Sequence, residues 1–154
     1  MLELIENNPF DVEGLKEVYQ TEKELKLSWP SARWPIEEGE WTQWLEAEHS
    51  ESVSLIFELH QKKIGHIAFK RYLLEPKMCY LCFVYMQPDF RSKGLSKVML
   101  DQALFYAKSR WSLDEVHLLV EKNNLRALQF YEKNGFQVLD TMNDKWRMRK
   151  MTES

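Results

Sequence analysis

The sequence predicts a single α/β domain, residues 1–154, built on a mostly antiparallel sheet. A chain of 154 residues suits one domain, and 44% apolar residues are enough for one sizeable core. Residues 53–59 and 63–71 are two strand-like segments separated by a short polar break, which predicts an antiparallel hairpin. From residue 78 onward, segments typical of strands and helices alternate. We therefore expect helices packed on a mixed sheet.

The N-terminal third predicts a strand and two helices. Residues 2–5 predict the strand, Asp11 opens the first helix, and residues 40–49 predict the second. The apolar faces of these helices are formed by Val12, Leu15, Val18 and Tyr19, and by Trp41, Trp44 and Leu45. Between the helices, residues 27–35 contain two prolines and two tryptophans. This segment cannot continue a helix and is too aromatic for an ordinary linker, so we expect a loop over the active site.

Residues 78–86 predict an apolar strand that contains Cys79 and Cys82. The spacing is that of half a zinc site, but it lies within a strand, with no second cysteine pair and no nearby histidine in the sequence. Alternation along a strand points the two thiols to opposite or skewed faces. We expect no metal and no redox role here, only two packed thiols of a reducing compartment.

Charge and hydropathy argue against two classes of partner. The formal net charge is -3 and no long basic run occurs, which argues against nonspecific nucleic-acid binding. Residues 1–10 lack a basic start followed by an apolar run, and no stretch is long enough to span a bilayer. We expect a cytoplasmic protein that binds neither nucleic acid nor membrane.

A basic loop formed by Arg91, Lys93 and Lys97 surrounds Gly94 at the start of a long predicted helix. The first backbone N–H groups of a helix have no partner within it and point outward as donors to an anion. Gly94 lets the main chain approach a ligand and adopt dihedral angles closed to other residues. The loop therefore predicts a diphosphate site, although a capped surface helix with an incidental basic turn has the same pattern. The expected buried face of the helix is formed by Leu95, Val98, Met99, Ala103 and Tyr106.

A strand, a helix and two further strands follow. Residues 116–120 are short, apolar and β-branched, and Asn124 comes after a polar break as a natural helix N-cap. Gly135 ends the helix with a residue that can take the left-handed C-cap conformation. Strands are then predicted at residues 136–139 and 145–150. The helix carries Ala127, Leu128 and Tyr131 at helical spacing.

Two motifs resemble the GNAT family of N-acetyltransferases. Residues 124–136 match the family pattern Asn-x-x-Ala-x-x-Phe/Leu-Tyr-Glu-Lys-x-Gly-Phe throughout. The basic loop matches the pattern Gln/Arg-x-x-Gly-x-Gly/Ala at Arg91 and Gly94, and departs from it at Ser96, where the family usually has glycine or alanine. Serine is small and keeps its backbone N–H, so we expect the site to tolerate it. The resemblance covers residues 78–136, the expected acetyl-coenzyme A-binding core.

The resemblance implies a fold, a cosubstrate and a set of site residues. The fold is a mixed, mostly antiparallel sheet of six or seven strands flanked by about four helices, splayed between strands 4 and 5 where acetyl-coenzyme A enters. The fourth strand would pair with the pantetheine arm, the loop would hold the pyrophosphate, and Tyr131 would be the general acid near the thioester sulfur. The implied cofactor-binding residues are Val84, Tyr85, Met86, Arg91, Ser92, Lys93, Gly94, Leu95, Ser96, Lys97, Asn124 and Tyr131.

The implied reaction is transfer of the acetyl group to a primary amine by direct attack in a ternary complex, with main-chain N–H groups near the end of the fourth strand stabilising the oxyanion. The amine must be neutral, but Leu119 stands where some family members carry a glutamate base. The open candidates for a base are Glu58, His66, Tyr80, Glu121 and a chain of water molecules. A noncatalytic acyl-coenzyme A-binding or interaction module, which needs neither Tyr131 nor a base, is the alternative.

Four of the six tryptophans lie at residues 29–44, in the region that shapes the acceptor site in the family. They would form either an apolar acceptor wall, with Trp29 and Trp34 as substrate-binding residues, or a core cover for the sheet. A cage for a cationic amine is a sharper form of the first alternative. The expected partner is a small-molecule or peptide amine, and a homodimer through residues 145–150 is a further expectation.

Overall fold

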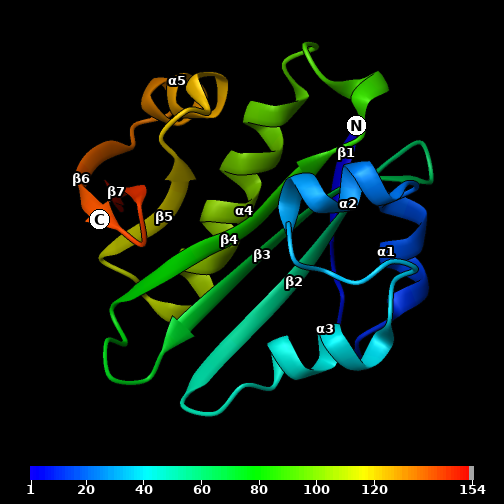
Figure 1. Ribbon diagram of the computed structural model, residues 1–154, viewed down its shortest axis with the longest axis horizontal. Coiled ribbons are helices and arrows are strands. Elements are labelled where there is room, and N and C mark those ends of the chain that lie inside the picture. The colour runs from blue at the N-terminus through cyan, green and yellow to red at the C-terminus, as the bar shows by residue number, and fades with distance from the viewer. Residues whose placement is uncertain (153–154) are drawn as a thin grey trace.

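The computed structural model describes residues 1–152 and contains a seven-stranded mixed sheet with helices on both faces (Figure 1). The strand order is β1-β2-β3-β4-β5-β7-β6, and each neighbouring pair is antiparallel except the parallel pair β4 and β5. The predicted mixed, mostly antiparallel sheet is therefore confirmed. The strands are β1 (Leu2–Glu6), β2 (Ser50–Leu59), β3 (Lys62–Tyr72), β4 (Met78–Met86), β5 (Glu115–Glu121), β6 (Gln137–Met142) and β7 (Lys145–Met151).

Helices α1, α2 and α3 cover one face of the sheet, and α4 and α5 cover the other. The helices are α1 (Val12–Val18), α2 (Glu22–Ser28), α3 (Glu38–Leu45), the short 3-10 helix η1 (Pro88–Phe90), α4 (Leu95–Trp111) and α5 (Leu125–Lys133). The sequence predicted about four helices and missed α2, a seven-residue helix in which only Leu25 is buried. The last turn of α2 includes Leu27 and Ser28, so the predicted loop begins at Trp29. Helix α3 ends at Leu45, whereas the sequence predicted that this helix would continue through residues 46–49.

The hairpin of β2 and β3 turns at His60 and Gln61, which both have positive φ, 50° and 68°. Two such residues twist the connection in the sense that two antiparallel strands need. The predicted hairpin is confirmed, and its two strands lie between the edge strand β1 and the central strand β4.

Strands β4 and β5 separate after four residue pairs. Their parallel pairing runs from Met78 with Glu115 to Leu81 with Leu118, and both strands continue beyond it. On the other side of β4, Phe69 pairs with Leu81 and Ala68 with Phe83, so Cys82 is the extra residue of a β-bulge. A bulge bends its strand and increases the local twist, which turns β4 away from β5. The predicted splay between strands 4 and 5 is therefore confirmed.

Helix α4 buries a slightly different face from the predicted one. Its buried residues are Met99, Leu100, Ala103, Ala107 and Trp111. Val98 was predicted to be buried but is 42% exposed, because the face turned to the sheet passes through Met99 and Leu100 instead. Tyr106 lies at the margin of the same core.

The C-terminal strand β7 is an internal strand, paired with β5 on one side and with β6 on the other. A dimer that extends the sheet cannot use β7, since both of its edges are occupied; the free edges belong to β1 and β6. Within residues 1–152, no helix combines the length and the apolar character that a membrane crossing requires.

Candidate functional site

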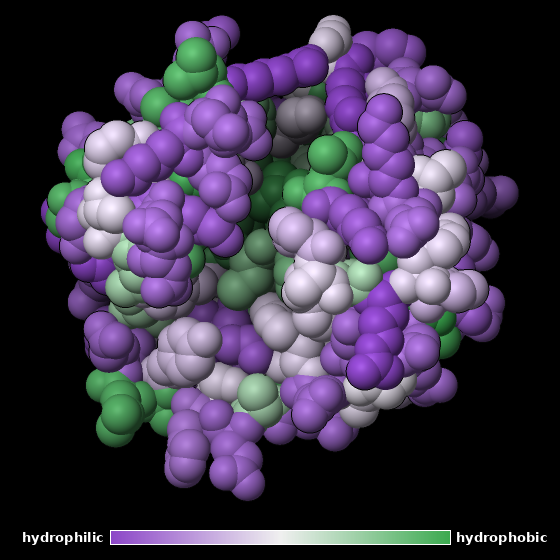
Figure 2. Space-filling model, viewed as in Figure 1, coloured by the Kyte–Doolittle hydropathy of each residue, from purple (hydrophilic) through white to green (hydrophobic). Residues whose placement is uncertain are grey.

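A cavity of about 620 Å³ lies where β4 and β5 separate. Figure 2 shows a hollow in this face of the molecule, with apolar residues at its floor and polar residues around it. The walls come from the end of α2 and the loop after it, from β4 and β5, from α5, and from the turn between β6 and β7. The lining residues include Ser28, Trp29, Tyr72, Tyr80, Cys82, Phe83, Val84, Glu121, Asn124, Tyr131, Met142, Asn143 and Lys145.

The basic loop predicted to bind a diphosphate, residues 91–97, is called the phosphate loop. It places Gly94 at the N-cap of α4 with a φ of 77°. Within residues 1–152, no side chain accepts a hydrogen bond from the first turn of this 17-residue helix at its cap. The N–H groups of Leu95, Ser96 and Lys97 therefore lack an intrahelical or capping partner and carry the positive end of the helix dipole. Among the described residues, no heavy atom lies within 4 Å of where a Cβ on Gly94 would be, so this position faces open space. The geometry suits an anion.

The guanidinium of Arg91 has partners within the protein. Its Nε donates to the carbonyl oxygen of Met86 at 2.7 Å, and its Nη2 lies 2.9 Å from Oε1 of Glu24 on α2. The hydroxyl of Tyr85 donates to the same carboxylate oxygen at 2.8 Å. Glu24 thus balances the charge of Arg91 and ties the phosphate loop to α2, whose last residue, Ser28, lines the cavity. This leaves Lys93 and Lys97 as the other cations of the loop, and Lys97 pairs with Asp101 at 2.7 Å.

The end of β4 has a main-chain edge without a strand partner. Val84, Tyr85 and Met86 pair with β3 on one side, but β5 has already separated on the other. Val84 lines the cavity with its side chain, whereas Tyr85 and Met86 are buried in the cores on the two faces of the sheet. A ligand that runs between β4 and β5 therefore meets a strand edge that is free to pair, apart from the Met86 carbonyl, which already accepts a hydrogen bond from Arg91.

Asn124 and Tyr131 project from α5 toward the same cavity. The Asn124 side chain accepts a hydrogen bond from the Ala127 N–H at 3.1 Å, which makes it the predicted N-cap. The Tyr131 ring packs edge-on against Phe130 and Phe136, with centroids 5.4 and 5.7 Å away. Burial raises the pKa of the Tyr131 phenol above its ordinary value. The group is therefore a protonated donor throughout the neutral pH range.

Two of the four side chains considered as bases lie away from the cavity. His66 is buried between the Tyr19 hydroxyl at 2.9 Å and the Ser54 hydroxyl at 3.0 Å, and burial lowers its pKa to about 3. Glu58 is 3.3 Å from Lys63. Tyr80 and Glu121 do line the cavity.

The four tryptophans at residues 29–44 have different surroundings. Trp29 lines the cavity, whereas Trp41 is 2% exposed and belongs to the core. Trp44 packs on Phe83 at the margin of the same core. Trp34 is 38% exposed and does not line this cavity. Of the predicted group, Trp29 therefore lies where an acceptor wall would be, Trp41 and Trp44 belong to the core or its margin, and Trp34 does neither.

The cysteines have the surroundings of packed thiols. Cys79 is buried, and burial raises the pKa of the Cys82 thiol to about 12. A thiol with such a pKa is not a nucleophile at neutral pH. In the part of the chain that the structure describes, no three His, Cys, Asp or Glu side chains are grouped as a metal site would need.

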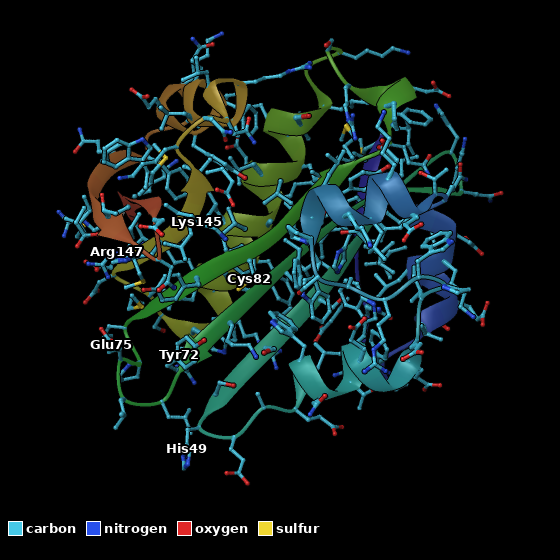
Figure 3. All side chains as sticks on the ribbon, viewed as in Figure 1. His49, Tyr72, Glu75, Cys82, Lys145 and Arg147 are labelled. Atoms are coloured by element: carbon cyan, nitrogen blue, oxygen red, sulfur yellow. The ribbon has the colours of Figure 1, made fainter. Side chains whose placement is uncertain are left out.

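Sequence reasoning missed several parts of this site. The contribution of α2, the link from Glu24 to Arg91, the bulge at Cys82, and the cavity residues Tyr72 and Lys145 were not predicted. Tyr72, Cys82 and Lys145, labelled in Figure 3, come from β3, β4 and β7. Their proximity depends on strand order and register, for which the local sequence carries no signal.

Comparisons with known proteins agree with this geometry. A sequence profile of the Acetyltransferase (GNAT) family matches residues 15–136. An uncharacterized N-acetyltransferase of Methanocaldococcus jannaschii is 26% identical over 129 residues, which cover 81% of this chain and 53% of that protein. A spermidine N(1)-acetyltransferase of Thermoplasma acidophilum is 35% identical over 71 residues, 46% of this chain and 44% of that protein. The chain thus spans about half the length of these curated relatives.

Solved structures share the fold. The PaiA N-acetyltransferase of Thermoplasma acidophilum, in complex with coenzyme A, has a TM-score of 0.71 at 23% identity and covers 99% of both chains. The spermidine N-acetyltransferase of Vibrio cholerae, in complex with coenzyme A and spermine, has a TM-score of 0.74 at 18% identity and covers 97% of this chain and 95% of its own. A GNAT family acetyltransferase of Elizabethkingia anophelis with acetyl-coenzyme A bound has a TM-score of 0.73 at 12% identity, over 98% of both chains.

Proposed function

Because this chain belongs to the acetyltransferase (GNAT) family, we propose that it moves the acetyl group of acetyl-coenzyme A to a primary amine of a small molecule or peptide. The observation that carries the proposal is the cavity between the separated ends of β4 and β5, with Tyr131 in its wall. The uncapped start of α4 follows β4 along the chain through η1 and the phosphate loop.

The residues present fit coenzyme A. The free N–H groups of Leu95, Ser96 and Lys97, with Ser92, Lys93 and Gly94 in the loop before them, would hold the pyrophosphate. The unpaired edge of β4 at Val84, Tyr85 and Met86 would pair with the amide groups of the pantetheine arm. Asn124 lies in the same cavity while it caps α5. Acetyl-coenzyme A, when bound, supplies the thioester that the reaction consumes.

The amine attacks the thioester carbonyl carbon in a ternary complex, and the carbon–sulfur bond then breaks. Main-chain N–H groups near the bulge at Cys82 would stabilise the oxyanion. The Tyr131 phenol, held protonated by its raised pKa, would donate to the departing sulfur. The proton that the attacking nitrogen loses restores the Tyr131 phenol by way of solvent, so the products are an amide and a free thiol. No side chain is assigned as the base.

Titration calorimetry with acetyl-coenzyme A tests the proposal, with adenosine diphosphate as the control for pyrophosphate affinity alone. We expect saturable one-site binding that is much tighter than the control, followed by acetylation of at least one amine in a panel. Absence of both binding heat and a thermal shift would overturn the proposed donor. Binding without acetylation of any amine would instead support a noncatalytic acyl-coenzyme A-binding module.

A further inference from the structure

One wall of the cavity is mostly aromatic. This aromatic wall consists of Trp29, Tyr72, Tyr80 and Phe83, together with Met142. Trp29 stacks on Phe83 with centroids 5.4 Å apart and an interplanar angle of 29°, and its other contact is edge-on to Trp41 at 4.9 Å. The rings of Tyr72 and Tyr80 meet edge-on at 6.2 Å, and the Tyr80 hydroxyl lies 4.0 Å from the Met142 sulfur. Rings fixed in this way offer apolar area at little further entropic cost.

The same cavity carries no excess of negative charge. Its charged lining residues are Glu121 and Lys145, and Nζ of Lys145 lies 3.6 Å from Oε1 of Glu121. Close to Cys82 is the buried amine of Lys70, which donates to the Trp44 carbonyl at 2.6 Å and lies 4.2 Å from the centre of the Trp44 ring. Within residues 1–152, no carboxylate forms an ion pair with Lys70. The surroundings of the wall are therefore neutral to positive.

A polyamine needs the opposite surroundings. Spermidine carries three positive charges in water, and each one that enters a cavity must find a carboxylate or the face of an aromatic ring, or keep its hydration. Here the single lining carboxylate already has a cation as its partner. An amine with one charge and an apolar body loses far less hydration and gains contact with the rings.

We propose that the acceptor is a monoamine with an aromatic or otherwise apolar body, and not a polyamine, an inference that rests on the proposed function. The assignment separates this chain from the spermidine acetyltransferases that it resembles in sequence and fold. The same surroundings assist the chemistry. Desolvation by the aromatic wall disfavours the charged form of a bound amine, so the neutral nucleophile becomes accessible without a dedicated base.

Binding of two probe amines to the protein saturated with coenzyme A tests the proposal independently of turnover. We expect 2-phenylethylamine to bind at least about 10-fold more tightly than spermidine at the same pH and ionic strength, a difference of about 1.4 kcal/mol. Spermidine binding as tightly as 2-phenylethylamine, or more tightly, would overturn the proposal. So would failure of both amines to bind.

A pair of variants links that preference to the cavity. Lys145→Gln leaves the Glu121 carboxylate without its cation, so the preference for 2-phenylethylamine over spermidine should fall by about 10-fold. The matched variant Glu121→Gln keeps the lysine and removes the carboxylate, so the preference should be retained or increase. If both variants show the same preference for 2-phenylethylamine as the parent protein, the acceptor does not bind beside Lys145 and Glu121, and the proposal is wrong.

Failure of this proposal and failure of the proposed function have different signatures. If 2-phenylethylamine binds preferentially but no amine of the panel is acetylated, the acetyltransferase assignment fails and the preference of the cavity for an apolar monoamine stands. If spermidine is acetylated with the higher kcat/KM, the acceptor class fails and the acetyltransferase assignment stands.

Discussion

Tyr131 and His66 are both buried, yet their surroundings have opposite consequences for function. Tyr131 lines the cavity and remains protonated because burial disfavours its anion. His66 is enclosed between Tyr19 and Ser54, and burial disfavours its cation. The first residue is suited to donate to a leaving group. The second stabilises the packing of the face that carries α1 to α3, as long as it stays neutral.

The Tyr131→Phe variant removes the phenolic donor and keeps the ring that packs on Phe130 and Phe136. We expect kcat to fall by about 100-fold, the range of a general acid, while the Kd for acetyl-coenzyme A changes little. Steady-state kinetics and titration calorimetry measure the two quantities. An unchanged kcat would exclude Tyr131 as the donor to the sulfur.

The buried His66 predicts an acid-labile fold. Its folded-state pKa of about 3 lies below the ordinary 6.5, so between these values the unfolded chain binds a proton that the folded chain does not. The free energy of unfolding should therefore fall by about 1.4 kcal/mol per pH unit as the pH drops below 6.5, from this group alone.

Urea unfolding at pH 7.5 and pH 5.0 checks the contribution of His66. The parent protein should lose about 2 kcal/mol more between the two values than the His66→Gln variant, which has no imidazole to titrate. Equal losses would show that His66 is not the group responsible.

At the scale of elements, the sequence was most informative where the signal is local. The strand at residues 78–86 was predicted with the bounds of β4, and α5 was predicted from its cap at Asn124 and its glycine at Gly135. Helix α2 was missed because seven residues with one buried leucine give no periodic pattern. The bulge at Cys82 was missed because a register shift depends on the partner strand as much as on the strand itself.

The site, like the secondary-structure elements, was predictable where its signal is local in the sequence. The two motifs point to Asn124 and Tyr131, which line one cavity in the structure, and to Gly94, which lies at an uncapped helix start. The salt bridge of Arg91 with Glu24 joins residues 67 positions apart, and the motif gives no sign of it. Side chains from α2 and β7 reach the cavity only through the topology of the sheet.

We infer from the salt bridge between Arg91 and Glu24 that the phosphate loop holds α2 in place. The Glu24→Gln variant keeps the shape of the side chain but weakens its contacts with Arg91 and Tyr85. We expect the KM for the amine to rise by about 10-fold, with the Kd for coenzyme A changed less than about 3-fold. The control is Glu22→Gln on the same helix, whose exposed partner is Lys26 at 3.1 Å; it should change neither quantity. Loss of coenzyme A affinity with an unchanged KM for the amine would contradict this role.

At the scale of the whole molecule, the sheet consists of two parts joined by a short seam. Strands β1 to β4 form one part and β5, β7 and β6 the other, and between them the strands pair only from Met78 with Glu115 to Leu81 with Leu118. Helix α4 connects β4 to β5 along the chain and packs in the core of its face of the sheet. A ligand that binds between β4 and β5 therefore contacts both parts.

Native-state hydrogen exchange tests this division. Acetyl-coenzyme A at about 100 times its Kd should raise the opening free energy of amides in β5 and β7 by up to about 2.7 kcal/mol. Amides in β2 and β3, which lie away from the seam, should gain less protection wherever they exchange through local opening and not through global unfolding. A gain confined to the first turn of α4 would contradict the proposed position of the pantetheine arm between the strands.

Helix α2 has a consequence for attempts to redesign this protein. It is only about 10 Å long, and one end meets the phosphate loop through Glu24 while the other supplies Ser28 to the cavity. Residues 27–30 are the natural targets for a library that seeks new acceptors. Substitutions there would also be transmitted to the donor side, so such a library is best screened at both scarce and saturating acetyl-coenzyme A. A variant that improves under only one of these conditions depends on the concentration of acetyl-coenzyme A differently from the parent protein.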